Sequence, residues 1–116
     1  MGDHECLNRL VIVPLPAEID MANEEDVGEQ LRAAFAPGVT VVIADLGSTV
    51  FCGTSGARQL VLAHKRAVAS NCELRVVISS AGVLRVLAIL GIDRALEIYP
   101  DLAAALATDG QGYVPG

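Results

Sequence analysis

VVIADLGSTVFCGTSGARQL, residues 41–60, joins an apolar, β-branched run to the start of a helical pattern. The run Val39–Ala44 predicts a strand that is covered on both faces. From Ser55 to about Ser70 a core-facing stripe recurs at helical spacing, formed by Ala57, Leu60, Val61, His64 and Val68. A buried strand followed by a crossover helix is typical of a parallel α/β sheet.

The segment Gly53-Thr54-Ser55-Gly56 lies where this helix is expected to begin. The first turn of a helix presents unpaired backbone N–H groups and the positive end of the helix dipole. Two hydroxyls between glycines at such a place can hold a phosphate or be contacted closely by another backbone. A simpler interpretation is that one hydroxyl only caps the helix. This segment is the first candidate for a functional site, with both hydroxyls expected to face outward.

The residues before this segment predict a strand, a helix and a loop. Arg9–Val13 is rich in β-branched residues and reads as a strand. Asp20 or Asn23 is a suitable N-cap for the helix that follows, whose core-facing positions are Val27, Leu31, Ala34 and Phe35. Gly47 to Gly53 is predicted as a loop in which Val50 and Phe51 enter the core.

The residues after the segment predict two more strands and two more helices. Asn71 is a reasonable helix-ending residue, and Leu74–Ser79 reads as a buried strand. Ser79 or Ser80 then caps a helix that ends at Gly91 and turns inward Val83, Leu84, Leu87 and Leu90. Ala95–Tyr99 and Leu102–Ala107 form the last strand and helix. The order β-α-β-α-β-α-β-α predicts parallel strands joined by right-handed crossover helices.

The totals predict a single domain that binds neither nucleic acid nor membrane. The chain has 116 residues, and we expect a loose segment at residues 1–9, one domain at 10–107 and a flexible tail at 108–116. The formal net charge is −6, and the eight basic residues are scattered without aromatic neighbours, which favours a basic protein partner over nucleic acid. No apolar run is long enough to cross a bilayer and no signal peptide is evident, so we expect a cytoplasmic protein.

No constellation in the sequence predicts catalysis. Ser55 has no base in reach, because His64 is roughly 13 Å away along the same helix. Asp45, which ends a strand, is a lone carboxylate and therefore a weak candidate for acid–base or metal chemistry. Three cysteines without metal-ligand spacing are expected to be small, buried, reduced thiols, namely Cys6, Cys52 and Cys72. We therefore expect no enzyme, no cofactor, no metal site and no catalytic residue.

With these residues laid out, the chain resembles the STAS domain of anti-sigma factor antagonists from about Leu10 to Ala107. LPAEID (Leu15–Asp20) is similar to the Gly-Glu-aliphatic-Asp element before the first helix of that family. Val41–Ala67 resembles its strand, its Asp-Ser-Ser/Thr-Gly motif and the helix beyond, with Gly53 in place of the Asp. Glu73–Ala107 is similar to the remaining strands and helices, including a leucine-rich turn.

The resemblance implies a fold and a function. The fold is a small mixed, mostly parallel β-sheet with helices packed on one face. The function is partner switching without catalysis: the antagonist binds an anti-sigma factor, often a serine/threonine kinase, until phosphorylation abolishes binding and a phosphatase restores it.

The site residues carry over position by position. The phosphoacceptor is Thr54, or Ser55 beside it. The expected partner-binding residues are Asp20, Asn23, Gly53, Thr54, Ser55, Gly56, Arg58 and Gln59. The sequence is compatible with a monomer or a weak dimer. Two alternatives stay open: a STAS-like ligand-sensing or scaffold module in a signalling complex without a phosphocycle, and, far less favoured, a hydrolase acting through Ser55.

Overall fold

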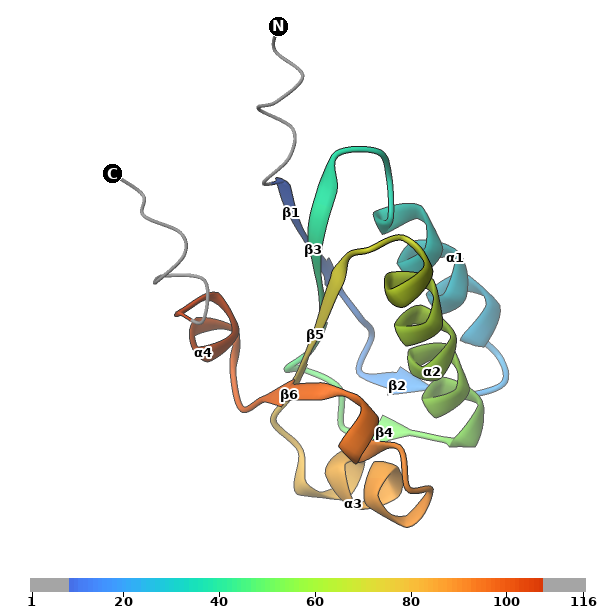
Figure 1. Cartoon of the computed structure of the whole chain (residues 1–116). Coiled ribbons are helices and arrows are strands. Elements are labelled where there is room, and N and C mark those ends of the chain that lie inside the picture. Colours follow the sequence, from blue (N-terminus) through green and yellow to red (C-terminus); the bar gives the residue numbers. More distant parts are fainter. Residues whose placement is uncertain (1–8, 108–116) are drawn as a thin grey trace, which may run out of the picture.

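A four-stranded sheet forms the centre of the computed structural model, which describes residues 9–107 (Figure 1). Its strands follow the order β1-β3-β5-β6, and each neighbouring pair is parallel. The strands are β1 (Arg9–Pro14), β3 (Val39–Leu46), β5 (Glu73–Ile78) and β6 (Glu97–Tyr99). The prediction of a small, mostly parallel α/β sheet is confirmed.

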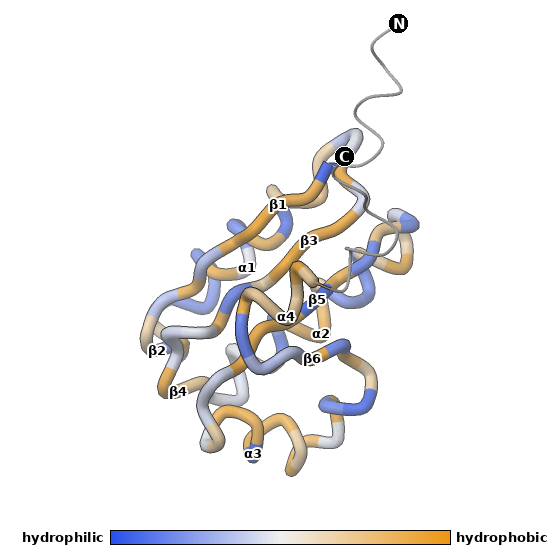
Figure 2. The backbone as a smooth tube through the Cα atoms, turned by 90° about the vertical axis from the view of Figure 1, so that its left-hand side faces the viewer, coloured by the Kyte–Doolittle hydropathy of each residue, from blue (hydrophilic) through white to orange (hydrophobic). Residues whose placement is uncertain are grey.

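Helices α1 (Glu24–Ala34) and α2 (Thr54–Ala69) cover one face of this sheet (Figure 1). Each new strand is added on the same side of the previous one, so right-handed crossovers place both helices on the same face. The main core lies between these two layers, and its most completely buried members include Leu31, Val42, Leu46, Leu60, Val76 and Ile78. In Figure 2 the central strands β3 and β5 are mostly hydrophobic, whereas the helices carry hydrophilic residues as well.

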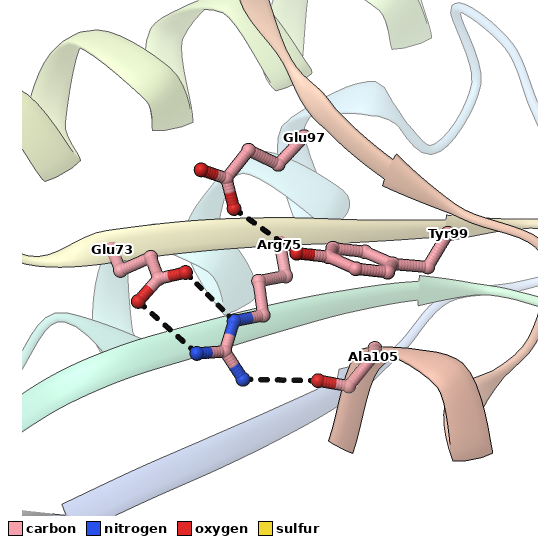
Figure 3. A network of polar contacts seen from close by, with 5 residues as sticks. All are labelled: Glu73, Arg75, Glu97, Tyr99 and Ala105. Carbon is pink, nitrogen blue, oxygen red and sulfur yellow. Dashed lines mark hydrogen bonds and ion pairs between the residues drawn. The ribbon is translucent and has the colours of Figure 1, made fainter. Parts of the chain in front are cut away.

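The short helix α4 (Leu102–Ala107) lies on the opposite face of the sheet. There Ala105 packs in a second, smaller cluster with Val41, Ile43 and Val77. Arg75 is buried on this face and donates a 2.9 Å hydrogen bond from one Nη to the Ala105 carbonyl (Figure 3). The guanidinium also forms two hydrogen bonds with the carboxylate of Glu73, so α4 is held by apolar contacts and by a charged group.

Two short strands outside the main sheet form a bridge of their own. β2 (Glu18–Ile19) pairs in parallel with β4 (Phe51–Cys52). The expected loop from Gly47 to Gly53 therefore contains a strand, and the expectation that Val50 and Phe51 enter the core is wrong, because they are 68% and 51% exposed. Thr49 takes the buried position instead: its Oγ1 donates to the carbonyl of Pro16 at 2.7 Å, and the next two side chains turn outward.

Both predicted helix ends after α2 and α3 (Ala81–Ile89) are confirmed. Asn71 has φ 58° and Gly91 has φ 76°, the left-handed conformation that closes a helix. In each case the next N–H bonds back into the last turn, from Cys72 to Ala67 and from Ile92 to Leu87. Ser80 caps α3 by accepting from the Val83 N–H at 3.2 Å. The last strand is shorter than expected, because Asp93–Ala95 forms a 3-10 turn, η2.

The predicted core-facing stripes of α2 and α3 are only partly right. Val68 is 69% exposed, and the buried stripe of α2 continues through Ala63 and Ala67 instead. On α3 only Val83 and Leu87 are buried, whereas Leu84 and Leu90 are exposed. On both helices the buried stripe is therefore narrower than the apolar pattern of the sequence predicts. Of the three cysteines, Cys52 is buried and Cys72 half-buried, and Cys6 lies outside the described residues.

Candidate functional site

The β2–β4 bridge brings together the segments that lead into α1 and α2 (Figure 1). The Gly53 N–H donates to the Ile19 carbonyl at 2.9 Å, and the Val50 N–H donates to the Ala17 carbonyl at 2.8 Å. Both helices start just after this bridge, at the edge of the sheet where parallel strands end. The structure thus places Asp20 close to Gly53 and Thr54, which are far away in the sequence.

Gly53 is the N-cap of α2, and no side chain caps this helix. Its backbone is extended and its carbonyl accepts from the Ala57 N–H at 3.0 Å. Thr54, Ser55 and Gly56 are therefore the first three helical residues, whose N–H groups have no carbonyl in a preceding turn. The interpretation that one of the two hydroxyls only caps the helix does not agree with this geometry.

The two hydroxyl residues differ in exposure. Thr54 is exposed, whereas Ser55 is only 8% exposed. The expectation that both hydroxyls face outward is therefore wrong for Ser55, which begins the buried stretch Ser55–Ala57 on the inner face of α2. Within residues 9–107 the Ser55 hydroxyl has no hydrogen-bond partner. An enzyme that modifies this segment can reach Thr54 far more easily.

Gly56 allows α2 to approach the β2–β4 bridge closely. A Cβ at this position would lie 2.6 Å from the Ile19 Cγ2 atom and 2.7 Å from the Cys52 Sγ atom. Both neighbours are 1% exposed and cannot move aside without disturbing the core. The glycine thus fixes where the N-terminus of α2 lies relative to Asp20.

A shallow hollow of about 610 Å³ lies in front of Thr54. Its walls contain the exposed apolar side chains of Met21 and Phe51, which are 83% and 51% exposed. Sequence reasoning misses these two residues, because the pattern predicts Phe51 in the core and does not place Met21 in the site. An apolar residue directly after Asp20 in a turn was the available signal. The remaining lining residues are Asp20, Glu24, Gly53, Thr54, Ser55 and Arg58.

Charges in the hollow are of both signs. The Arg58 guanidinium lies 4.0 Å from a carboxylate oxygen of Glu24, and their side chains are 62% and 20% exposed. Asp20 is held by its own loop, since its Oδ1 accepts from the Ala22 N–H at 2.9 Å. Two carboxylates and one guanidinium thus line the hollow together with Thr54.

Three residues of the predicted site do not line this hollow, namely Asn23, Gly56 and Gln59. The Asn23 side-chain amide donates to the Glu18 carbonyl at 2.8 Å, and its oxygen accepts from the Asp20 N–H at 3.0 Å. Asn23 therefore shapes the loop. Gln59 lines a separate groove between α1 and α2, where its side-chain oxygen lies against Gly28.

The other residues considered for chemistry lie elsewhere. Asp45 closes a turn by accepting from the Gly47 N–H at 2.9 Å, and His64 is half-buried on α2. Burial raises the pKa of the Cys52 thiol, which stays protonated at neutral pH.

Among residues 9–107, no group of three His, Cys, Asp or Glu side chains could hold a metal ion. In the same part of the chain, the helices are too short or too polar to span a membrane.

Comparison with protein family models identifies the family of this chain. The family model of the STAS domain matches residues 3–105. The chain belongs to the STAS domain family. The predicted resemblance to this family is confirmed.

Three solved structures share the fold. An anti-sigma factor antagonist from Mycobacterium paratuberculosis is similar with a TM-score of 0.76 and 24% identity over 84% of each chain. A protein of Thermotoga maritima assigned as an anti-sigma factor antagonist gives a TM-score of 0.69 at 17% identity, over 84% of this chain and 86% of that one. A sulfate transporter family protein from Wolinella succinogenes gives 0.73 at 15% identity, over 88% and 85%. No curated protein sequence matches the chain.

Proposed function

We propose that this STAS domain is a cytoplasmic anti-sigma factor antagonist that acts by partner switching. The family match and the likeness to two antagonist structures support the general role. The single observation that carries the proposal further is the exposed hydroxyl of Thr54 in the hollow between the two helix starts.

The hollow and its rim form the proposed binding surface for an anti-sigma factor. Met21 and Phe51 supply apolar area that is exposed in the isolated domain, and Asp20 and Arg58 supply charges of opposite sign. Buried apolar anchors surrounded by polar groups are typical of protein interfaces. Gly53, Thr54 and Ser55 complete the lining. Asn23, Gly56 and Gln59 support this surface from behind or beside it.

Phosphorylation of Thr54 would change this surface more than any other modification. The partner kinase would transfer the γ-phosphoryl group of ATP to Oγ1 of Thr54, with the bond to ADP broken and the hydroxyl proton released. The phosphate adds about −1.5 to −2 charges at neutral pH. A partner that packs against a neutral hydroxyl beside Asp20 and Glu24 then meets bulk and concentrated negative charge. A phosphatase would restore binding. Ser55 is the second candidate acceptor, but its burial disfavours it.

The experiment starts from the native partner. Co-purification from the source cell identifies the bound anti-sigma factor, and mass spectrometry after incubation with that kinase and ATP locates the phosphate. We expect it on Thr54, and phosphate found only outside Thr54 and Ser55 would reject the switch. Thr54→Glu should weaken the complex at least tenfold, whereas Gln30→Glu, which adds the same charge at an exposed site on α1, should not.

A second candidate function is a ligand-sensing or scaffold module without a phosphocycle. Gly53 stands where the antagonist motif has Asp, which removes a carboxylate beside the acceptor. The likeness to a sulfate transporter family protein also shows that this fold occurs outside the antagonists. In this case Thr54→Ala would leave both partner affinity and its regulation unchanged.

A further inference from the structure

Arg58 lies on α2 four residues after Thr54. Residues four apart on a helix are neighbours on its surface, and both side chains line the same hollow. Among residues 9–107, Arg58 is the only cation that lines it. A group added to the Thr54 oxygen therefore enters the reach of this guanidinium.

The present partner of Arg58 holds it weakly. The contact with Glu24 is 4.0 Å long, and the Arg58 side chain is 62% exposed. The Glu24 side chain is 20% exposed, but a contact of this length to a mostly exposed guanidinium contributes little to stability. The side chain can therefore leave Glu24 at small cost.

We propose that Arg58 exchanges Glu24 for the phosphate when Thr54 is phosphorylated, an inference that rests on the proposed function. A phosphate carries more charge than a carboxylate and accepts two parallel hydrogen bonds from a guanidinium. The free N–H groups at the start of α2 stabilise the same anion. The Ser55 side chain, which also lines the hollow and has no hydrogen-bond partner within residues 9–107, is a further donor.

The exchange changes the surface at two places. Arg58 partly neutralises the phosphate inside the domain, so the fold is retained. Glu24 loses its counter-charge and faces a partner as a free carboxylate beside Asp20. The switch therefore consists of a new phosphate on α2 together with an uncovered carboxylate on α1.

The test uses the full chain with phosphothreonine inserted at position 54 during translation, so that neither kinase nor partner is needed. A ³¹P NMR titration gives the pKa of the phosphate, normally near 6. Arg58→Gln should raise it by about half a pH unit, the effect expected of one exposed ion pair. Lys65→Gln removes the same charge further along α2, outside the hollow, and should leave the pKa unchanged.

A second variant separates charge from shape. Arg58→Lys keeps the positive charge and should recover part of the lowering. Equal phosphate pKa values in the parent and in Arg58→Gln would overturn the exchange, while leaving the proposed function untouched. Conversely, failure of a kinase to modify Thr54 would count against the proposed function and not against this measurement.

Discussion

Gly56 and Ile19 are so close that a Cβ on residue 56 would lie 2.6 Å from the Ile19 Cγ2 atom. This approach ties the start of α2 to β2, and hence the Thr54 hydroxyl to the loop that carries Asp20. The geometry of the candidate site therefore depends on the absence of one side chain.

Gly56→Ala should destabilise the domain. Overpacking a filled core costs about 1–3 kcal/mol, and the better helix propensity of alanine returns up to about 1 kcal/mol. We expect a net loss of about 1–2 kcal/mol in urea unfolding. Gly82→Ala on α3 is the matched control, because a Cβ there meets only the Ser80 Oγ at 3.6 Å; it should be neutral or stabilising. Equal stability of the two variants would contradict the close contact between Gly56 and the side chains of Ile19 and Cys52.

Gly53→Asp should stabilise the domain. The backbone at Gly53 is extended, and a Cβ there has only ordinary contacts, the nearest at 3.6 Å from the Phe51 ring. An Asp side chain can accept from the free N–H groups of α2, and it reduces the freedom of the unfolded chain. We expect a gain of about 0.5–1 kcal/mol by thermal or urea unfolding. Gly53→Ala, which lacks the capping oxygen, should gain less, and a larger gain with Ala would contradict the capping argument.

Arg75→Met should loosen α4. The substitution keeps the apolar stem of the side chain but removes the hydrogen bonds to Glu73 and to the Ala105 carbonyl (Figure 3). A buried acceptor left without a donor costs about 1–3 kcal/mol. Hydrogen exchange should therefore speed up in α4, while α1 and α2 stay protected. Arg94→Met, at an exposed position, is the control; unchanged exchange in α4 would contradict this role of Arg75.

The fold was largely predictable because its signals are local. Val39–Ala44 reads as a buried strand, and Asn71, Ser80 and Gly91 mark helix ends wherever the chain folds. Phe51 and Val68 were assigned wrongly because burial of a single residue depends on the layer opposite it. Phe51 turns outward because the Thr49 hydroxyl bonds to Pro16, a contact between residues 33 positions apart that no local pattern shows.

The candidate site was predictable only in part. The hydroxyl pair could be located from the strand and helix that flank it. The pairing of β2 with β4, which places Met21 and Glu24 beside Thr54, could not be inferred from two segments of two residues each. Likewise, the burial of Ser55 follows from the rotation of α2 against this bridge, which Gly56 sets.

Stability should fall at alkaline pH through Cys52. Burial raises the pKa of this thiol above its ordinary value of 9.0. Well below pH 9 the folded and unfolded chains both keep the proton, so the thiol adds no pH dependence there. As the pH rises further, the unfolded chain releases a proton that the folded chain retains, and the free energy of unfolding falls by up to about 1.4 kcal/mol per pH unit until the folded thiol also ionises. Urea unfolding between pH 8 and about 10.5 measures this slope. Cys52→Ala should lose this part of the slope, whereas Cys72→Ala should keep it, and identical slopes in both variants would contradict the assignment.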